Sequence, residues 1–386
     1  MSGRRQPVLG ILGGGQLARM LALAAAPLGV KTLVVDSAAD ACAGQVAPLL
    51  VADWKDYVAL ERFAREVDVV TFDFENVPAE TAHWLAERVA VSPVPRALAV
   101  AQDRLAEKTL FRECGLQTPA FVAVDTREDL DRALAEVGAP AILKTRRLGY
   151  DGKGQFRLRT SQDADAAWAA LGEQGAAHGL ILEAFVPFER ELSVVAVRSR
   201  EGDFRTWPLT RNWHTDGVLS LSLAPAPDIE ELQRRVTGLA RTLAERLEYV
   251  GVFALELFVE DGELLGNEMA PRVHNSGHWT IEGAHTSQFE NHVRAVLGLP
   301  LGDTGARGLS CMFNWIGELP DPAPVLTTTD AHWHDYGKQA RPGRKVGHAT
   351  VCAPDARTLA ERMATIAGAL HREAQAGPAL DLLRHL

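Results

Sequence analysis

The stretch PVLGILGGGQLA at positions 7–18 decides the class of fold. An apolar run, Pro7–Leu12, leads into three glycines, and residues 16–28 then carry a helical pattern. Further continuous apolar runs follow at 31–35 and 67–72. Such runs are typical of strands buried on both faces, and their alternation with helices predicts a doubly wound parallel sheet.

The glycine loop of this stretch is open to three interpretations. Gly13–Ala18 fits the pattern G-x-G-x-x-A between a strand and a helix, and Asp36 closes the next strand. This resembles the dinucleotide fingerprint, in which the acid holds a ribose hydroxyl of NAD. The glycines also fit a pocket for another phosphorylated ligand at a helix N-terminus, or a tight turn without a ligand.

Length and composition limit the class of protein. The chain has 386 residues, enough for two to three domains, and a net charge of −10. Its 47% hydrophobic and 23% charged residues are ordinary for a globular protein, and an acidic chain is poorly suited to coat nucleic acid. No apolar run is long enough to span a membrane. Scattered cysteines argue against a disulfide framework or a structural zinc site, so we expect a cytoplasmic enzyme.

A change of composition near Ser92–Pro95 predicts a domain boundary, and one helix is expected over 97–114. We predict an N-terminal domain over 1–100, a central domain over 101–300 with lobes at about 116–187 and 188–300, and a C-terminal domain over 301–386. Strand-like runs in the central part lie at 139–144, 181–186, 192–197, 253–258 and 264–268, and a late helix is expected at 356–371.

A second glycine-rich loop follows the strand that ends at Lys144. Gly149, Gly152 and Gly154 permit close approach of the backbone to an anion, and Lys153 adds charge. The loop is not a Walker A sequence, because no G-K-[ST] opens a helix. A solvated hairpin tip is the alternative.

Paired acids are the strongest local signal. Glu256 lies inside an apolar strand, and Glu268 ends the next strand after Asn267. On adjacent antiparallel strands the two carboxylates would repel, and Mg²⁺ with nucleotide phosphates would relieve this repulsion. The alternative is a pair of solvent-facing acids. Arg272 and His274 follow directly and indicate an anion-handling loop rather than a zinc site.

Glu183 and Glu191 lie eight positions apart, at the ends of two predicted strands. At a hinge between strands they could accept hydrogen bonds from a ribose or an adenine amino group. Ordinary solvation of strand ends is the commoner explanation for a single glutamate.

These motifs resemble the ATP-grasp superfamily and, within it, the 5-(carboxyamino)imidazole ribonucleotide synthases of purine biosynthesis. The resemblance covers nearly the whole chain, and its most specific segments are Gly149–Gln155, Asn267–Thr280 and Arg341–His348. It implies an α/β fold with a doubly wound pre-ATP-grasp domain, a two-lobed α+β ATP-grasp unit and a small β-rich C-terminal domain. The implied substrates are ATP, bicarbonate and aminoimidazole ribonucleotide, with Mg²⁺ as the metal and a homodimer as the assembly.

The resemblance also implies roles for individual residues. The expected ATP contacts are Arg104, Lys144, Gly149, Tyr150, Asp151, Gly152, Lys153, Gly154, Gln155, Glu183, Val186, Glu191, His214, Asn267 and Glu268. Glu256 and Glu268 are the implied Mg²⁺ ligands, while Arg272, His274 and Lys338 are the implied catalytic residues. The ribonucleotide would meet Gly15, Gln16, Tyr150, Asp151, Asn275, Lys338, Arg344 and Lys345.

Three other functions compete with this one. A formate-dependent glycinamide ribonucleotide transformylase would share the domain plan, but the YDGKGQ and NSGHWT stretches fit it less well. An NAD-dependent dehydrogenase would use the first glycine loop and leave Glu256 and Glu268 without a role. A non-catalytic nucleotide-binding module would bind ATP without turnover.

Overall fold

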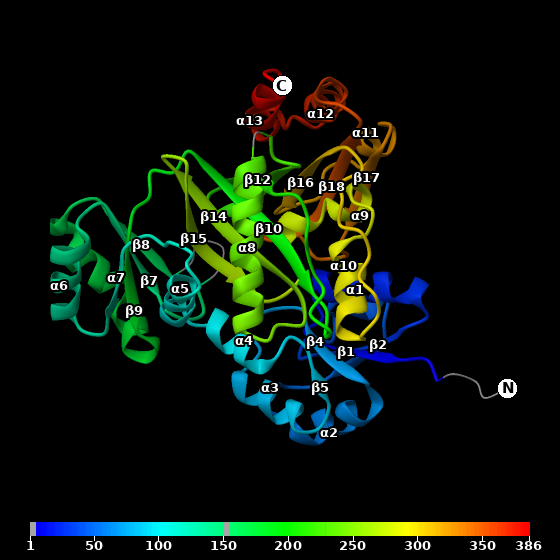
Figure 1. Ribbon diagram of the computed structural model, residues 1–386, viewed down its shortest axis with the longest axis horizontal. Helices are drawn as coiled ribbons and strands as arrows, with labels where there is room; N and C mark the ends of the chain where they lie inside the picture. The colour runs from blue at the N-terminus through cyan, green and yellow to red at the C-terminus, as the bar shows by residue number, and fades with distance from the viewer. Residues whose placement is uncertain (1–4, 150–153, 228) are drawn as a thin grey trace.

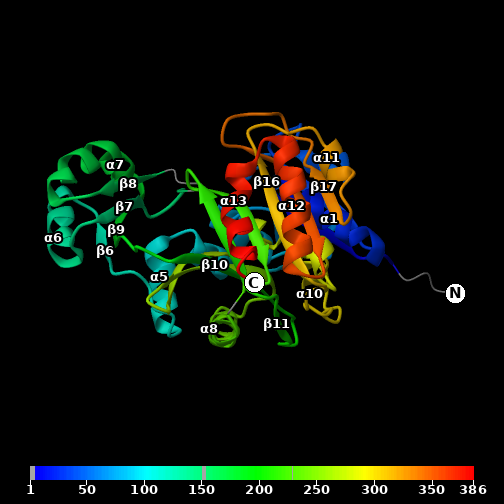
Figure 2. The same cartoon turned by 90° about the horizontal axis from the view of Figure 1, so that it is seen from above.

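The computed structural model describes residues 5–149, 154–227 and 229–386. Its elements form three sheets with helices packed against them (Figure 1). The four-stranded sheet and its helices project to one side of the molecule, away from the C-terminal helices, as the view from above also shows (Figure 2).

The N-terminal part is a five-stranded parallel sheet, as the apolar runs predict. Its strand order is β3-β2-β1-β4-β5, and every neighbouring pair is parallel. The order reverses between β1 and β4, and ligands of such sheets bind at the carboxyl ends of the strands at this point. The elements are β1 (Val8–Leu12), α1 (Gln16–Ala25), β2 (Lys31–Asp36), β3 (Leu49–Val51), α2 (Tyr57–Glu66), β4 (Val69–Phe72), α3 (Ala79–Ala86) and β5 (Ala90–Val91).

The single helix predicted over 97–114 is wrong, because two helices occupy this region. α4 (Pro95–Ala101) ends before Asp103, and α5 (Arg104–Glu113) begins directly after it. The Asp103 carboxylate accepts the backbone N–H of Leu105 at 3.0 Å and caps α5. A capping carboxylate stabilises a new helix start that apolar periodicity does not reveal.

The first lobe of the central region is a four-stranded antiparallel sheet with the order β6-β9-β7-β8. Two helices cover it, and their apolar faces share one core with the strands. The elements are β6 (Phe121–Val124), α6 (Arg127–Val137), β7 (Ala141–Thr145), β8 (Gln155–Leu158), α7 (Ala164–His178) and β9 (Leu180–Ala184).

A larger sheet joins the second lobe to the C-terminal region. Within the described residues it has nine strands in the order β15-β14-β10-β12-β13-β16-β18-β17, with β11 paired to β10. The strands expected for a separate C-terminal domain therefore continue the sheet of the second lobe. They are β10 (Arg190–Arg198), β11 (Phe204–Thr206), β12 (Thr210–Thr215), β13 (Val218–Ala224), β14 (Gly251–Glu260), β15 (Glu263–Ala270), β16 (Leu309–Ile316), β17 (Ala331–Asp335) and β18 (Lys345–Ala353).

Within the described residues, six helices of the second lobe and the C-terminal region accompany this sheet, and the predicted helix over 356–371 is confirmed as α12. They are α8 (Glu230–Arg246), α9 (Thr280–Gly283), α10 (Gln288–Val296), α11 (Ala323–Leu326), α12 (Ala356–Leu370) and α13 (Glu373–Leu383). In the part of the chain that the structure describes, no helix combines the length and apolarity needed to cross a bilayer.

A buried histidine joins the N-terminal sheet to the second lobe. His292 on α10 accepts the backbone N–H of Val252 at its Nδ1 atom, 3.0 Å away. Its Nε2 atom therefore carries the proton and donates to the Thr71 hydroxyl on β4, at 2.7 Å. One apolar core also runs from α1 into α10, so the two parts are packed together.

Candidate active site

A cavity of about 960 Å³ lies where the three sheets meet. Its volume falls within the range of small-molecule sites. Seventeen of the residues singled out from the sequence line it: Gly15, Gln16, Arg104, Lys144, Gly149, Gln155, Glu191, His214, Glu256, Asn267, Glu268, Arg272, His274, Asn275, Lys338, Arg344 and Lys345. Tyr150, Asp151, Gly152 and Lys153 lie outside the described residues. Gly154, Glu183 and Val186 do not line the cavity.

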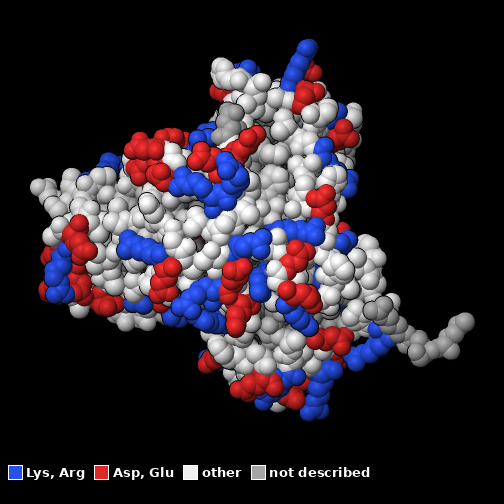
Figure 3. All heavy atoms as spheres, viewed as in Figure 1, with Lys and Arg blue, Asp and Glu red and all other residues white. Residues whose placement is uncertain are grey.

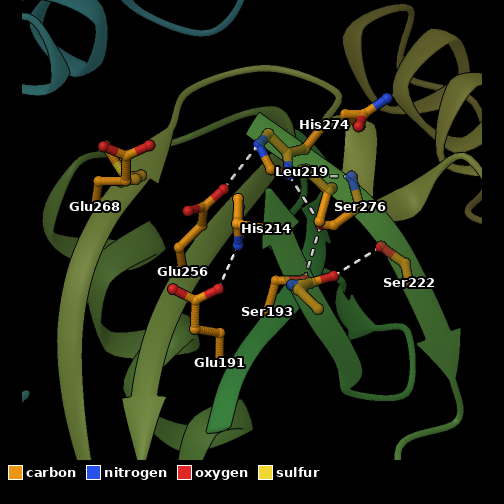
Figure 4. Close-up of polar contacts among 12 residues, drawn as sticks. Glu191, Ser193, His214, Leu219, Ser222, Glu256, Glu268, His274 and Ser276 are labelled. Atoms are coloured by element: carbon orange, nitrogen blue, oxygen red, sulfur yellow. Dashed lines mark hydrogen bonds and ion pairs between the residues drawn. The ribbon is translucent and has the colours of Figure 1, made fainter. Parts of the chain in front are cut away.

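The two paired carboxylates meet as the sequence predicts. Glu256 on β14 lies directly opposite Glu268 on β15, and both side chains face the cavity (Figure 4). Glu256 lies 3.1 Å from His274 Nε2, and Glu268 lies 3.2 Å from the Arg104 guanidinium. Burial opposes ionisation of Glu256, but the hydrogen bond from His274 helps to lower the pKa of Glu256 to about 2. Glu256 is therefore ionised at neutral pH.

These residues fit a hard divalent cation. Two carboxylates and the neighbouring Asn267 offer oxygen donors at one wall of the cavity, the donor type that Mg²⁺ prefers. Among the residues that the structure describes, no cluster of three or more His, Cys, Asp or Glu side chains is arranged to hold a metal by itself. A cation here would therefore need further oxygen ligands, as Mg²⁺ with nucleotide phosphates commonly has.

A chain of buried hydrogen bonds determines which ring nitrogen of His274 carries the proton. Asn212 donates to Ser193 at 2.9 Å, Ser193 donates to Ser276 at 2.8 Å, and Ser276 lies 2.8 Å from His274 Nδ1. The backbone N–H of Ser276 also donates to Nδ1, at 3.3 Å, so Nδ1 is an acceptor. The neutral ring therefore carries its proton on Nε2, the atom that faces Glu256.

Arg272 is held in place by an acid that the sequence analysis missed. Its guanidinium donates to Glu75, which follows β4 in the N-terminal part. Burial works against the charge of Arg272, but Glu75 outweighs it and raises the pKa of the guanidinium. The only sequence signal was that Glu75 follows a predicted strand of the parallel sheet.

Glu183 lies behind the cavity wall and not in it. Its carboxylate is buried, and one oxygen accepts both Lys144 at 2.9 Å and Lys108 at 3.2 Å. Burial disfavours its charge, but the two lysines lower the pKa of Glu183 to about 2. The sequence analysis missed Lys108, because a fully buried lysine on a helix has no local signature.

Backbone N–H groups of the first glycine loop donate to acids of the protein itself. Gly14 N–H donates to Asp36 at 2.6 Å, and Gly15 N–H and Ala18 N–H donate to Asp73 at 2.7 and 2.8 Å. Asp36, the residue that a dehydrogenase would offer to a ribose, is thus engaged by its own loop. The dehydrogenase alternative is therefore not supported.

At the opposite end of the cavity, Lys338 donates to Gln16. Burial lowers the pKa of the Lys338 ammonium, while Asp73 acts to raise it. Asn275 exchanges hydrogen bonds with Asn314, and Arg344 donates to the Gln339 carbonyl at 3.2 Å. This end of the cavity therefore offers cationic and amide groups.

His214 and Glu191 form a hydrogen-bonded pair beside Glu256, on the side of Glu256 that faces away from Glu268 (Figure 4). Burial works against the charge of His214, but the hydrogen bond to Glu191 raises the pKa of the ring.

Across the face of the molecule seen in Figure 3, basic and acidic groups are interspersed. This face carries no broad basic surface of the kind that nucleic-acid binding needs.

The parallel sheet, the two lobes and the cavity between them define an ATP-grasp enzyme. Family models describe the matching regions as a ribonucleotide synthetase preATP-grasp domain at 7–102, an ATP-grasp domain at 109–289 and a phosphoribosylaminoimidazole carboxylase C-terminal domain at 310–362. The chain belongs to the N5-carboxyaminoimidazole ribonucleotide synthase family, and it is an ATP-dependent ligase of purine biosynthesis.

Individual relatives support this membership. The chain is 51% identical to the N5-carboxyaminoimidazole ribonucleotide synthase of Pseudomonas aeruginosa, over 93% of this chain and 98% of the relative. A crystal structure of the synthetase from Thermus thermophilus is 54% identical, with a TM-score of 0.89 over 93% of this chain and 98% of the other. The Aspergillus clavatus enzyme, solved with ADP and 5-aminoimidazole ribonucleotide, is 30% identical, with a TM-score of 0.84 over 99% of both chains.

The family resemblance noted in the sequence is thereby confirmed, together with the fold class. The transformylase and the non-catalytic module are not supported, because the relatives over nearly the full length are synthases.

Proposed function

We propose that this cavity carboxylates 5-aminoimidazole ribonucleotide with ATP and bicarbonate. A bicarbonate oxygen attacks the γ-phosphorus of ATP, the bond to ADP breaks, and carboxyphosphate forms. The amino nitrogen of the ribonucleotide then takes the carboxyl group and loses a proton, and phosphate leaves. The product is 5-(carboxyamino)imidazole ribonucleotide, named N5-carboxyaminoimidazole ribonucleotide in the relatives.

The nucleotide occupies the side of the cavity between the two lobes. Arg104 and Lys144 provide positive charge for its phosphates, and Gly149 and Gln155 of the second glycine-rich loop line the same cavity. Glu191 and His214 receive the ribose on the β10–β12 side, and the backbone at Val186 meets the adenine. Phosphoryl transfer depends mainly on such positioning and charge neutralisation. These roles are supported by the shared cavity lining of Arg104, Lys144, Glu191 and His214.

Glu256 and Glu268, with Asn267 beside them, would hold Mg²⁺. When bound, this ion neutralises charge on the transferring phosphoryl group. The protein's own contribution is to keep Glu256 ionised through His274 and to keep Glu268 oriented through Arg104.

Arg272 and His274 hold bicarbonate and then carboxyphosphate. Arg272 suits this role because its planar guanidinium matches a carboxylate or phosphate, and Glu75 fixes its orientation. His274 can donate from Nε2 to an anion that takes the place of Glu256. Closure of the site keeps water away from the labile intermediate.

The ribonucleotide occupies the end of the cavity near the N-terminal sheet. Lys338, Arg344 and Lys345 meet its phosphate and ring, with Asn275, Gly15 and Gln16 beside them and Tyr150 and Asp151 from the loop. Because Asp73 already takes the Gly15 N–H, Gln16 and Lys338 serve as the polar side chains of this subsite.

The observation that carries this proposal is that Glu256 and Glu268 face each other in a cavity that also contains Arg272, His274 and Lys338. The test is phosphate release with ATP, bicarbonate and ribonucleotide omitted one at a time, and with formate in place of bicarbonate. Full release requires all three substrates. Undiminished release with formate alone, or without the ribonucleotide, contradicts the reaction.

We also propose that the enzyme works in the cytoplasm as a homodimer. Its substrates are small polar metabolites, and the described cysteines carry no disulfide, which suits a reducing compartment. Light scattering of the purified chain tests the assembly, and a monomer at micromolar concentration contradicts it.

A further inference from the structure

A buried junction joins the two lobes behind the phosphate side of the cavity. Lys108 on α5 has no exposed surface, and its Nζ atom lies 3.2 Å from Glu183 of β9. The same Nζ donates to the carbonyl oxygen of Asn267 on β15 at 3.1 Å. One ammonium group thus touches the four-stranded sheet, the nine-stranded sheet and the helix between them.

Glu183 is the shared acceptor of this junction. A single carboxylate oxygen takes both lysines, and the other oxygen has no hydrogen-bond partner among the described residues. The two lysines differ in access, because Lys144 lines the cavity and Lys108 does not. Lys144 can therefore turn toward a ligand, while Lys108 stays with the carboxylate.

We propose that Lys108 is a positioning residue: it serves as the fixed counter-ion of Glu183, so that Lys144 is free to engage the nucleotide phosphates. A buried carboxylate left without a partner is strongly unfavourable. Without Lys108, moving Lys144 to a phosphate would create such a carboxylate, and Lys144 would remain bound to Glu183. This inference rests on the proposed phosphate role of Lys144.

The burial of the junction supports these separate roles of Lys108 and Lys144. The Glu183 carboxylate stays charged, because its pKa of about 2 lies far below neutrality. Burial and the neighbouring Lys108 both lower the pKa of Lys144, while Glu183 raises it. A phosphate would supply Lys144 with a new counter-charge when it leaves Glu183, and Lys108 would then be the remaining cation on that carboxylate.

The test is ATP affinity, measured by calorimetry in the full chain, with ribonucleotide KM as the second readout. Lys108→Met keeps the length of the side chain and removes its charge. We expect its Kd for ATP to rise at least tenfold, while the KM for the ribonucleotide changes less than twofold. Lys108→Arg, which keeps the charge, should recover part of the affinity. An unchanged Kd for ATP in a folded Lys108→Met variant overturns the proposal.

A double variant isolates the charge of Glu183. In Lys108→Met/Glu183→Gln no buried anion holds Lys144, so ATP should bind more tightly than in Lys108→Met. Double-mutant coupling of this kind reports the interaction between the two sites. If the double variant binds no better than the single variant, Lys108 does not act through Glu183.

Two further comparisons decide the outcome if Lys108→Met does not fold or if Lys144 does not bind the phosphates. If Lys108→Met does not fold, the double variant must still bind ATP more tightly than Lys144→Met, and equal weakness overturns the proposal. If Lys144→Met binds ATP like the unmodified chain, the phosphate role of Lys144 fails instead. Phosphate release that still requires all three substrates would then leave the proposed reaction standing.

Discussion

His292 makes the junction between the N-terminal sheet and the second lobe sensitive to acid. The ring is fully buried, and both nitrogens are occupied, one by Val252 N–H and one by the Thr71 hydroxyl. Burial lowers the pKa of His292 to about 3. A protonated ring would place a charge in an apolar core and convert the acceptor Nδ1 into a donor that faces the Val252 N–H, so the folded chain keeps His292 neutral.

The size of the effect follows from linkage. An unfolded histidine takes up its proton near pH 6.5, whereas the folded chain resists protonation until about pH 3. Between these values the unfolded state binds more protons, so stability is complete above pH 6.5 and falls as the pH falls. For His292 alone, the loss between pH 7 and pH 5 is about 2 kcal/mol.

The perturbation is His292→Gln, in which the amide can still accept from Val252 and donate to Thr71 but does not titrate. We expect the variant to be less stable at pH 7, because a planar ring is lost from a packed core. Its further loss between pH 7 and pH 5 should be smaller than that of the unmodified chain by about 2 kcal/mol.

The assay is urea unfolding at the two pH values, followed by tryptophan fluorescence. His385→Gln, at an exposed position near the C-terminus, is the matched control and should retain the full pH dependence. An equal pH-dependent loss in His292→Gln and the unmodified chain would refute the assigned protonation state.

Three further substitutions test the site. Glu268→Ala should abolish ATP turnover while the circular dichroism spectrum stays unchanged. The control Glu263→Ala, at the exposed start of the same strand, should leave turnover intact. Near-normal ADP production by Glu268→Ala would exclude the metal assignment. Lys338→Ala should raise the ribonucleotide KM at least tenfold and the ATP KM less than twofold, and equal effects on both would count against its placement. Gly15→Ala would put a methyl group 2.4 Å from an Asp73 oxygen, so the free energy of unfolding should fall by about 1–3 kcal/mol and the ribonucleotide KM should rise. Unchanged thermal unfolding would show that the loop tolerates a side chain.

The sequence by itself was enough to predict the parallel sheet and the facing carboxylates. Continuous apolar runs mark buried strands wherever they occur, because burial on both faces leaves no polar positions. Glu256 and Glu268 were identified because an acid inside an apolar strand is costly without a partner, and a short turn brings the two strands together.

The break between α4 and α5 shows where local patterns stop being informative. Leu98 and Phe111 are both buried, so the apolar periodicity continues across the boundary. Asp103 nevertheless starts a new helix, and its carboxylate also binds Arg146 at 3.1 Å and Arg147 at 3.1 Å beside the second glycine loop. Those partners lie more than forty positions away, and only the folded chain brings them to Asp103.

Only the tertiary structure determined which charged groups pair with one another. Glu183 was expected to meet the nucleotide, and Lys108, Glu75 and Asp73 were given no role, because nothing within a few positions of these residues reveals their partners. Glu183, Lys108 and Asp73 are buried and Glu75 is partly buried, and each meets a partner that is distant in the sequence. Burial makes an unpaired charge costly, so these long-range pairs determine which lysine, arginine and backbone groups are left to meet a substrate.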